Sequence, residues 1–402
     1  MSALRKTFRL WWQPPRKVTE VEEDRSVSFL ELFYDLAYVV IVAQLTHTLV
    51  RHPTMVGFLG FVALFTLVWW AWVNGSYYHE LHGNYDIRTR VFTFLQMFAL
   101  FGMAIFAPTA LGTGASGFSL SYAAFLGLIT WLWWRTGVHD EKHRPVSQPY
   151  TLGFILTTGI FVISAFTTAP QTYYLWALGI LLSLLTPLIF LKYQQRLDAN
   201  QLEAAQQVRA SLVERFGLLT IIMLGEVIVA VVSGVLHHDV VSLALVLNAA
   251  LGLGIAMALW WIYFDFASHH VPIQQTLPRF SWLYLHLPLT MGIALTGAGL
   301  LALLEHNTTG FLHGEQWFLL GPIALVLFTV ALLVQTLDID ASHTEIHHQG
   351  GLGSVGSGVA MLALGFLALP ATWLLVAISV LLVAPIMIAV RMWVKGLQRA
   401  HS

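Results

Sequence analysis

The sequence predicts an all-α polytopic membrane protein with about twelve transmembrane helices, arranged as two parallel six-helix repeats. Three observations support this fold class. The chain has 402 residues, of which 57% are hydrophobic. Only 10% are charged, whereas a soluble domain has about 25% charged residues. The third observation is that the two halves of the chain resemble each other. This composition leaves no room for a large soluble domain beside the membrane part.

Twelve apolar runs are long enough to cross a bilayer, which takes roughly 20 residues each. They cover residues 28–50, 55–78, 90–110, 118–137, 150–169, 172–192, 211–236, 241–266, 281–304, 316–337, 354–371 and 373–393. The last two are the least distinct, because only Pro370 separates them. The expected division is a tail at 1–27, a first repeat at 28–192, a polar linker at 193–210, a second repeat at 211–393 and a tail at 394–402.

The basic residues indicate how the chain is oriented. If the N-terminus is cytoplasmic, only Arg51 among the 20 Lys and Arg residues falls on the outer side. Lys and Arg concentrate in cytoplasmic segments of membrane proteins. We therefore expect both termini and the linker to lie on the cytoplasmic side of a bacterial inner membrane.

The chain also contains an internal repeat. SFLELFYDLAYVVIVAQL at 28–45 matches SLVERFGLLTIIMLGEVI at 211–228, and Pro187 near the end of the first half matches Pro385 near the end of the second. Because each half holds six predicted spans, the second half enters the membrane in the same orientation as the first. Such parallel repeats are common in transporters, where sites lie at the repeat interface.

These repeated segments resemble a known family. FLELFYDLAYVVIVAQLTHTL (29–49), LVERFGLLTIIMLGEVIVA (212–230), WWIYFDFASHH (260–270) and LHLPLTMGIALTGAG (285–299) are similar to signature segments of the bacterial low-temperature-requirement A (LtrA) family. The resemblance covers most of the chain. It implies a multi-pass membrane protein, and the family name refers to growth in the cold. It implies no particular reaction.

Two acidic residues near the start of the first span have different explanations. Ser28-x-x-Glu31 and Ser211-x-x-Glu214 are both capping-box patterns, so Glu31 and Glu214 are either structural caps or part of a pathway. Asp35 lies roughly 10 Å beyond Ser28 at 1.5 Å per residue and has no capping role. It is either an ion or substrate site or the partner of Arg215 in a structural ion pair.

Glu226 lies deeper in the membrane than any other acid, roughly 22 Å along its helix from Ser211. No basic residue falls at that depth in any predicted span. A carboxyl group there must be protonated, hydrogen-bonded or next to water. We expect it to belong to the ion or substrate pathway, with Gln44 as a candidate partner in the first repeat. A protonated Glu226 that only joins two helices is the alternative.

Asp265 and His286 belong to the same inner layer of the predicted membrane domain. Histidine titrates near neutral pH, so the two are candidates for a proton relay along the pathway. A histidine with a purely structural hydrogen bond remains the alternative.

The sequence predicts neither a metal site nor a cofactor. Residues 338–351 are predicted to form an exposed loop in which His343 and His347 have a spacing that suits a metal, but no further ligand pattern accompanies them. There are no cysteines. Neither a phosphate-binding loop nor a nucleophile elbow is present. The net charge of −1 gives no reason to expect nucleic acid.

The leading functional expectation is a secondary transporter or ion-coupled permease, not an enzyme, with its site between the repeats. Its partners would be the lipid bilayer and an unidentified ion or small molecule, and a homo-oligomer is a further expectation. One alternative is a cation or proton channel. Another is a membrane-embedded enzyme or lipid-handling protein linked to growth in the cold, in which Glu80 and Arg88 could join Asp35, Asp265 and His286 in an active site. A third is a sensory or scaffold protein without transport.

Overall fold

The computed structural model describes residues 13–20, 25–84, 86–194, 202, 207–305, 316–340 and 344–400. This part of the chain is helical and contains no strand beyond one isolated bridge between Pro272 and Leu337. Its long helices are α2 (Phe29–Arg51), α3 (Met55–His82), α4 (Ile87–Phe106), α5 (Ala115–His139), α6 (Arg144–Ser164), α7 (Gln171–Gln194), α9 (Ala210–Leu236), α10 (Leu243–Phe266), α11 (Thr276–Glu305), α12 (Trp317–Val334), α13 (Thr344–Leu364) and α14 (Ala371–Ala400). Two short 3₁₀ helices, η1 (Val18–Glu20) and η2 (Ala107–Thr109), complete the described elements.

Eleven of these helices are long and apolar enough to cross a membrane. Among the described helices α13 is the exception, because its first half, TEIHHQGGLG, is polar and rich in glycine. It begins at Thr344, whereas the apolar run predicted a span from 354. The all-helical fold class is thus confirmed, with eleven candidate spans in place of twelve.

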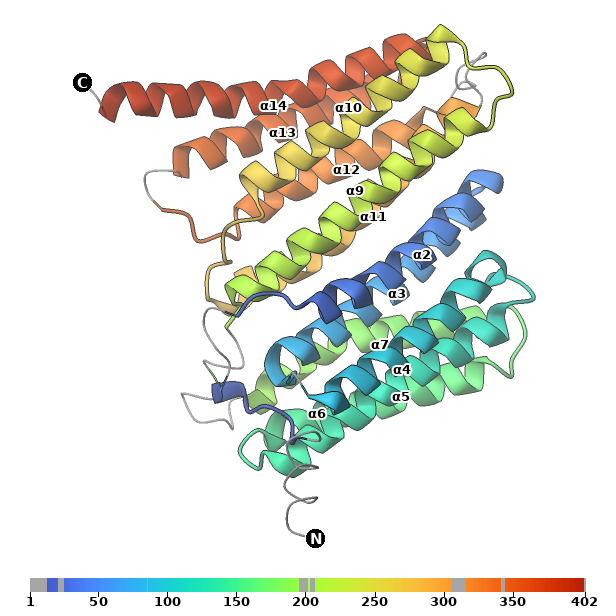
Figure 1. Cartoon of the computed structure of the whole chain (residues 1–402), viewed down its shortest axis with the longest axis vertical. Helices are drawn as coiled ribbons and strands as arrows, with labels where there is room; N and C mark the ends of the chain where they lie inside the picture. Colours follow the sequence, from blue (N-terminus) through green and yellow to red (C-terminus); the bar gives the residue numbers. More distant parts are fainter. Residues whose placement is uncertain are drawn as a thin grey trace. The chain divides into compact units, whose positions relative to one another are not determined.

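The chain divides into two compact units. Unit 1 comprises Met1–Thr48 and Thr54–Leu212, and unit 2 comprises Leu49–Pro53 and Val213–Ser402. In unit 1, α4, α5, α6 and α7 pack in chain order, and α3 packs against α5 and α7 (Figure 1). In unit 2, α11, α12, α13 and α14 pack in chain order, and α10 packs against α12 and α14.

Glycines allow helices to approach closely inside each unit, which is the usual way for helices to pack in a bilayer. A Cβ atom on Gly75 in α3 would collide with the Tyr34 hydroxyl oxygen of α2. In unit 2, a Cβ on Gly299 in α11 would meet the backbone of Phe318 at 2.8 Å. Larger residues at these two positions would force the helices apart.

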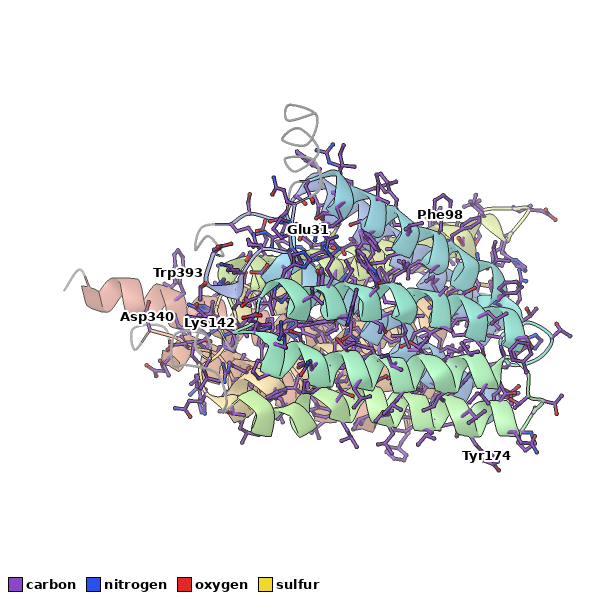
Figure 2. All side chains as sticks on the ribbon, turned by 90° about the horizontal axis from the view of Figure 1, so that it is seen from below. Glu31, Phe98, Lys142, Tyr174, Asp340 and Trp393 are labelled. Atoms are coloured by element: carbon purple, nitrogen blue, oxygen red, sulfur yellow. The ribbon has the colours of Figure 1, made fainter. Side chains whose placement is uncertain are left out.

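The outer surface of unit 1 is apolar, as expected for a protein surrounded by lipid. Phe98 on α4 is 72% exposed and Tyr174 on α7 is 71% exposed. Figure 2 shows both side chains pointing away from the helices that carry them. A soluble protein would not leave so many large apolar side chains in water, so these surfaces are suited to acyl chains.

Candidate functional site

A buried cluster of charges lies where α2 begins and α3 ends, in unit 1. The Arg25 guanidinium contacts Glu31 of α2 through Nη2 and Glu80 of α3 through Nη1, each at 2.5 Å. The side chains of Arg25, Glu31 and Glu80 are 8%, 7% and 4% exposed. Ser211 Oγ donates to the second oxygen of Glu80 at 2.7 Å. One cation thus joins two helices through carboxylates that have little access to water.

Glu31 also caps α2. Its Oε2 accepts from the backbone N–H of Ser28 at 2.9 Å and from the Ser28 hydroxyl at 2.8 Å, while the Glu31 N–H reaches Ser28 Oγ at 3.3 Å. These are the reciprocal bonds of a capping box. Glu31 therefore has two roles in the structure, as a cap and as a partner of Arg25.

The matching pattern in the second half behaves differently. α9 begins at Ala210, so Ser211 is already inside the helix and cannot be its N-cap. Its hydroxyl is directed at Glu80 instead. Glu214 is exposed. The role of Glu214 stays a prediction.

Asp35 is completely buried. The indole N–H of Trp72 on α3 donates to Asp35 Oδ1 at 2.8 Å. Beside it on α2, the hydroxyls of Tyr34 and Tyr38 are 2.7 Å apart. The Tyr34 ring also lies 6.1 Å from the His79 ring of α3. The α2–α3 interface is therefore polar well inside two apolar helices.

The chain before α2 lies across this end of unit 1. The backbone N–H of Gln13 donates to Asp86 at 2.9 Å, and Asp86 caps α4. The N–H of Arg16 donates to the carbonyl of His82 at 3.3 Å. The carbonyl of Arg16 accepts from His82 Nδ1 at 2.9 Å. Residues 13–18 are thus fixed to the ends of α3 and α4 by their backbone.

A cavity of about 410 Å³ adjoins the charged cluster. It lies among the segment before α2, the start of α2, the end of α3 and the first turns of α4. Its lining residues are Arg25, Ser26, Val27, Ser28, Phe29, Leu30, Glu31, His79, Gly83, Asn84, Thr89, Arg90 and Thr93. His79 and Thr93 are its most buried polar members, and their Nε2 and Oγ1 atoms lie 3.4 Å apart. The size suits a small polar solute.

A second polar group occupies the loop between α5 and α6. His143 is 1% exposed and its ring lies 5.2 Å from that of His82. Burial lowers the pKa of His143 to about 4, although the nearby Asp140 carboxylate opposes this change. His143 is therefore neutral at physiological pH.

In unit 2, His286 is buried in an aromatic environment formed by Phe216, Tyr263 and Trp282. Its Nδ1 lies 2.7 Å from the carbonyl oxygen of Trp282, which can only accept, so Nδ1 carries a proton. In the neutral ring Nε2 then accepts from the Tyr263 hydroxyl at 3.2 Å. Both ring nitrogens therefore have partners within unit 2.

The structure does not bring Asp265 and His286 together. Asp265 is exposed on α10 and accepts from the Trp261 indole of the same helix. No hydrogen bond between Asp265 and His286 is found in the described part of unit 2. The predicted relay has no direct connection, because residues 263 and 265 lie on different faces of α10.

The remaining predicted pathway residues are distributed over both units. Asp35 and Gln44 belong to unit 1, while Arg215 and Glu226 belong to unit 2. Arg215 and Glu226 are 2% and 4% exposed. Gln44 is half-buried, and its backbone carbonyl accepts from the Thr48 hydroxyl at 2.7 Å. Their roles stay predictions.

The segment predicted as an exposed loop at 338–351 is largely the start of α13. His347 is buried, its Nδ1 lies 3.1 Å from the Phe266 carbonyl oxygen, and its ring contacts that of His270. His343 lies outside the described residues. Within those residues, no group of three or more His, Asp or Glu is arranged to hold a metal ion.

Sequence reasoning assigned no site role to Arg25, which it treated as one of many tail charges, or to His79 and Thr93. Arg25 follows a polar stretch and precedes Ser28 by three residues. A lone arginine just before a capped apolar helix is too common a pattern to single out. Its role depends on Glu80, which is distant in the chain.

The fold and the buried charges define a multi-pass membrane protein with polar groups inside its spans. A family model described as "Bacterial low temperature requirement A protein (LtrA)" matches residues 26–392. The chain belongs to this family, as its sequence segments indicated. It is also 24% identical over 293 residues to an uncharacterized protein of Rhizobium meliloti (strain 1021), with 70% of each chain covered. No solved structure matches the chain.

Proposed function

We propose that this protein is a secondary transporter or ion-coupled permease of the bacterial inner membrane. The observation that carries the proposal is the full burial of Asp35 inside an apolar membrane helix, with an indole N–H as a hydrogen-bond donor. Ionisable groups inside spans are costly, by about 2.5–3.5 kcal/mol on insertion scales, and usually mark an ion or substrate route. Glu226 of unit 2 meets the same criterion of burial within a span.

A two-repeat architecture fits this proposal. Each pair of packed helices in α3–α7 has a counterpart in α10–α14: α3 with α5 and α7 corresponds to α10 with α12 and α14. Pro187 and Pro385 lie inside the corresponding helices α7 and α14. These parallels support two repeats with the same orientation, a layout that many transporters share.

An N-in orientation also fits. Residues 13–20, with Arg16 and Lys17, and then Arg25 lie at the end of unit 1 where α2 begins. The positive-inside rule assigns such an end to the cytoplasm. The cavity would then open towards the cytoplasm, and both termini would lie there.

The proposal is tested by ion flux in proteoliposomes that contain the full chain and a pH-sensitive dye. Proton, sodium and potassium gradients are applied in turn to wild type, Asp35→Asn, Glu226→Gln and the matched control Asp239→Asn, whose carboxylate is exposed. We expect flux in wild type and the control and its loss in the two variants. Absence of flux in wild type under every gradient would argue against ion coupling, and unsaturable flux would favour a channel.

A further inference from the structure

Ser76 of α3 and Gln96 of α4 are among the buried polar side chains of unit 1 that have no hydrogen-bond partner in the described residues. Both amide atoms of Gln96 on α4 and the hydroxyl of Ser76 on α3 are in this position. Gln96 is fully buried and Ser76 is 1% exposed. An unsatisfied buried amide or hydroxyl costs about 1–3 kcal/mol, so such groups nearly always have a partner, often ordered water.

Both residues lie one turn deeper along their helices than a contact between α3 and α4. The helices are consecutive and run in opposite directions, and the contact between His79 and Thr93 fixes their alignment. Ser76 precedes His79 by three residues, and Gln96 follows Thr93 by three, so each lies on the same helix face as the contact residue. Ser76 and Gln96 therefore lie at the same depth, each one turn beyond the contact pair.

The same contact forms the inner wall of the cavity, since His79 and Thr93 line it. Gln96 is nine residues into α4, roughly 13 Å from the start of the helix at 1.5 Å per residue. A line of polar groups thus leads from the cavity to the middle of the membrane helices. On the opposite side, the Tyr34 ring packs against His79 and its hydroxyl lies over Gly75.

We propose that the cavity continues between α3 and α4 to a buried, hydrated binding site formed by Ser76 and Gln96. The site takes a small uncharged group that carries both a donor and an acceptor, such as water, a hydroxyl or a carboxamide. A primary amide presents one acceptor and two donors, which fits such a group. Neither Ser76 nor Gln96 carries a charge, so the groups of the site itself favour an uncharged ligand.

This inference rests on the proposed function, because it describes the entrance of the same transport route. Its test, however, measures hydration and not flux. The protein has no cysteines, so single cysteines can be introduced without any background. The thiolate is the species that reacts with thiosulfonate reagents, and it forms only where water reaches the sulfur.

The experiment uses full-length protein in membrane fragments that are open on both sides, with a cationic methanethiosulfonate reagent. Ser76→Cys is compared with Ser26→Cys, which lies in the exposed lining of the cavity, and with Ser119→Cys, which is fully buried and bonded to Ser164 and Trp176. We expect Ser76→Cys to react about tenfold or more faster than Ser119→Cys. Adding Gln96→Leu should slow the reaction at position 76, because an apolar side chain removes the water.

Equal, slow labelling of Ser76→Cys and Ser119→Cys, with fast labelling of Ser26→Cys, would overturn the inference. Fast labelling of all three would overturn it as well, because access would then not be specific to the α3–α4 route. If Ser76→Cys does not fold, Gln96→Cys reports on the same site with the same expected rates. Labelling without any ion flux would keep the hydrated site and reject only the transport function.

Discussion

Trp72 of α3 donates its indole N–H to Asp35 of α2 at 2.8 Å, and the side chains of both residues are buried within apolar helices. A tryptophan that would otherwise be assigned to an interfacial aromatic belt is therefore a hydrogen-bond donor to a buried carboxyl group. This bond couples the most unusual residue of α2 to the neighbouring helix.

Trp72→Phe should lower the stability of the folded protein by more than its smaller ring alone would explain. It removes the donor and leaves the Asp35 carboxyl group without this bond, at a cost of about 1–3 kcal/mol. We expect a lower thermal midpoint for the detergent-solubilised protein in a fluorescence assay. Trp176→Phe, which loses a bond to Ser119 and Ser164 but faces no carboxylate, is the control. An equal fall of the thermal midpoint in both variants would show that losing the bond to the Asp35 carboxyl group costs no more than losing a bond to serine hydroxyls.

Arg25→Met should be strongly destabilising. It leaves Glu31 and Glu80 buried near each other without their shared cation, and breaking a buried ion pair from one side costs about 3–5 kcal/mol. We expect little folded protein in size-exclusion chromatography.

The rescue is specific to this mechanism. Adding Glu31→Gln and Glu80→Gln to Arg25→Met removes both stranded charges, and a glutamine keeps the capping box of α2. Recovery of a monodisperse peak is expected. An Arg25→Met protein as stable as wild type, or a triple variant as unstable as Arg25→Met, would contradict the role of the bridge.

The helical fold was predictable from sequence because apolar runs of span length carry their own signal. α13 is the exception: Ser354 and Gly356 lie in the apolar run, but the helix begins ten residues before it, in the polar stretch that starts at Thr344. That stretch forms a helix because His347 and Gly350 pack against Phe266. Such tertiary packing cannot be predicted from the hydropathy of the sequence.

The candidate site was only partly predictable. Asp35 was found because a carboxyl group in an apolar run is rare and costly. Arg25, Glu80 and Gln96 were not assigned to one site, because their significance depends on which helices lie side by side. The two equivalent capping patterns at Ser28 and Ser211 show the same limit, since the first forms the predicted bonds, whereas α9 already begins before Ser211.

The two serines of these capping patterns should respond differently to alanine. Ser28→Ala removes an N-cap and should cost about 1 kcal/mol, within the usual range for such caps. Ser211→Ala removes one hydrogen bond to a charged acceptor that keeps Arg25 as a partner. With Glu80→Gln in the background, the effect of Ser211→Ala should shrink while that of Ser28→Ala stays unchanged. Thermal midpoints of the four variants decide this, and equal shifts in both backgrounds would mean that Ser211 does not act through Glu80.

Acid should destabilise unit 1 through His143. Burial lowers the pKa of His143 to about 4 in the folded protein, whereas an unfolded chain has a histidine pKa near 6.5. The unfolded state therefore binds more protons between these values, so the stabilising contribution is complete above about pH 6.5 and is lost as the pH falls towards 4. Over that window the loss amounts to roughly 3 kcal/mol.

The measurement is the thermal midpoint of the solubilised protein at pH 7.5 and at pH 5 for wild type, His143→Gln and His237→Gln. His237 is exposed and serves as the control. His143→Gln should lower the midpoint at pH 7.5, because its ring packs against His82 and Trp133, yet show a smaller further drop at pH 5 than wild type. His237→Gln should retain the full acid sensitivity. If His143→Gln and wild type lose the same stability between the two pH values, another group is responsible for the acid response, and the buried neutral state of His143 is not what makes the protein sensitive to acid.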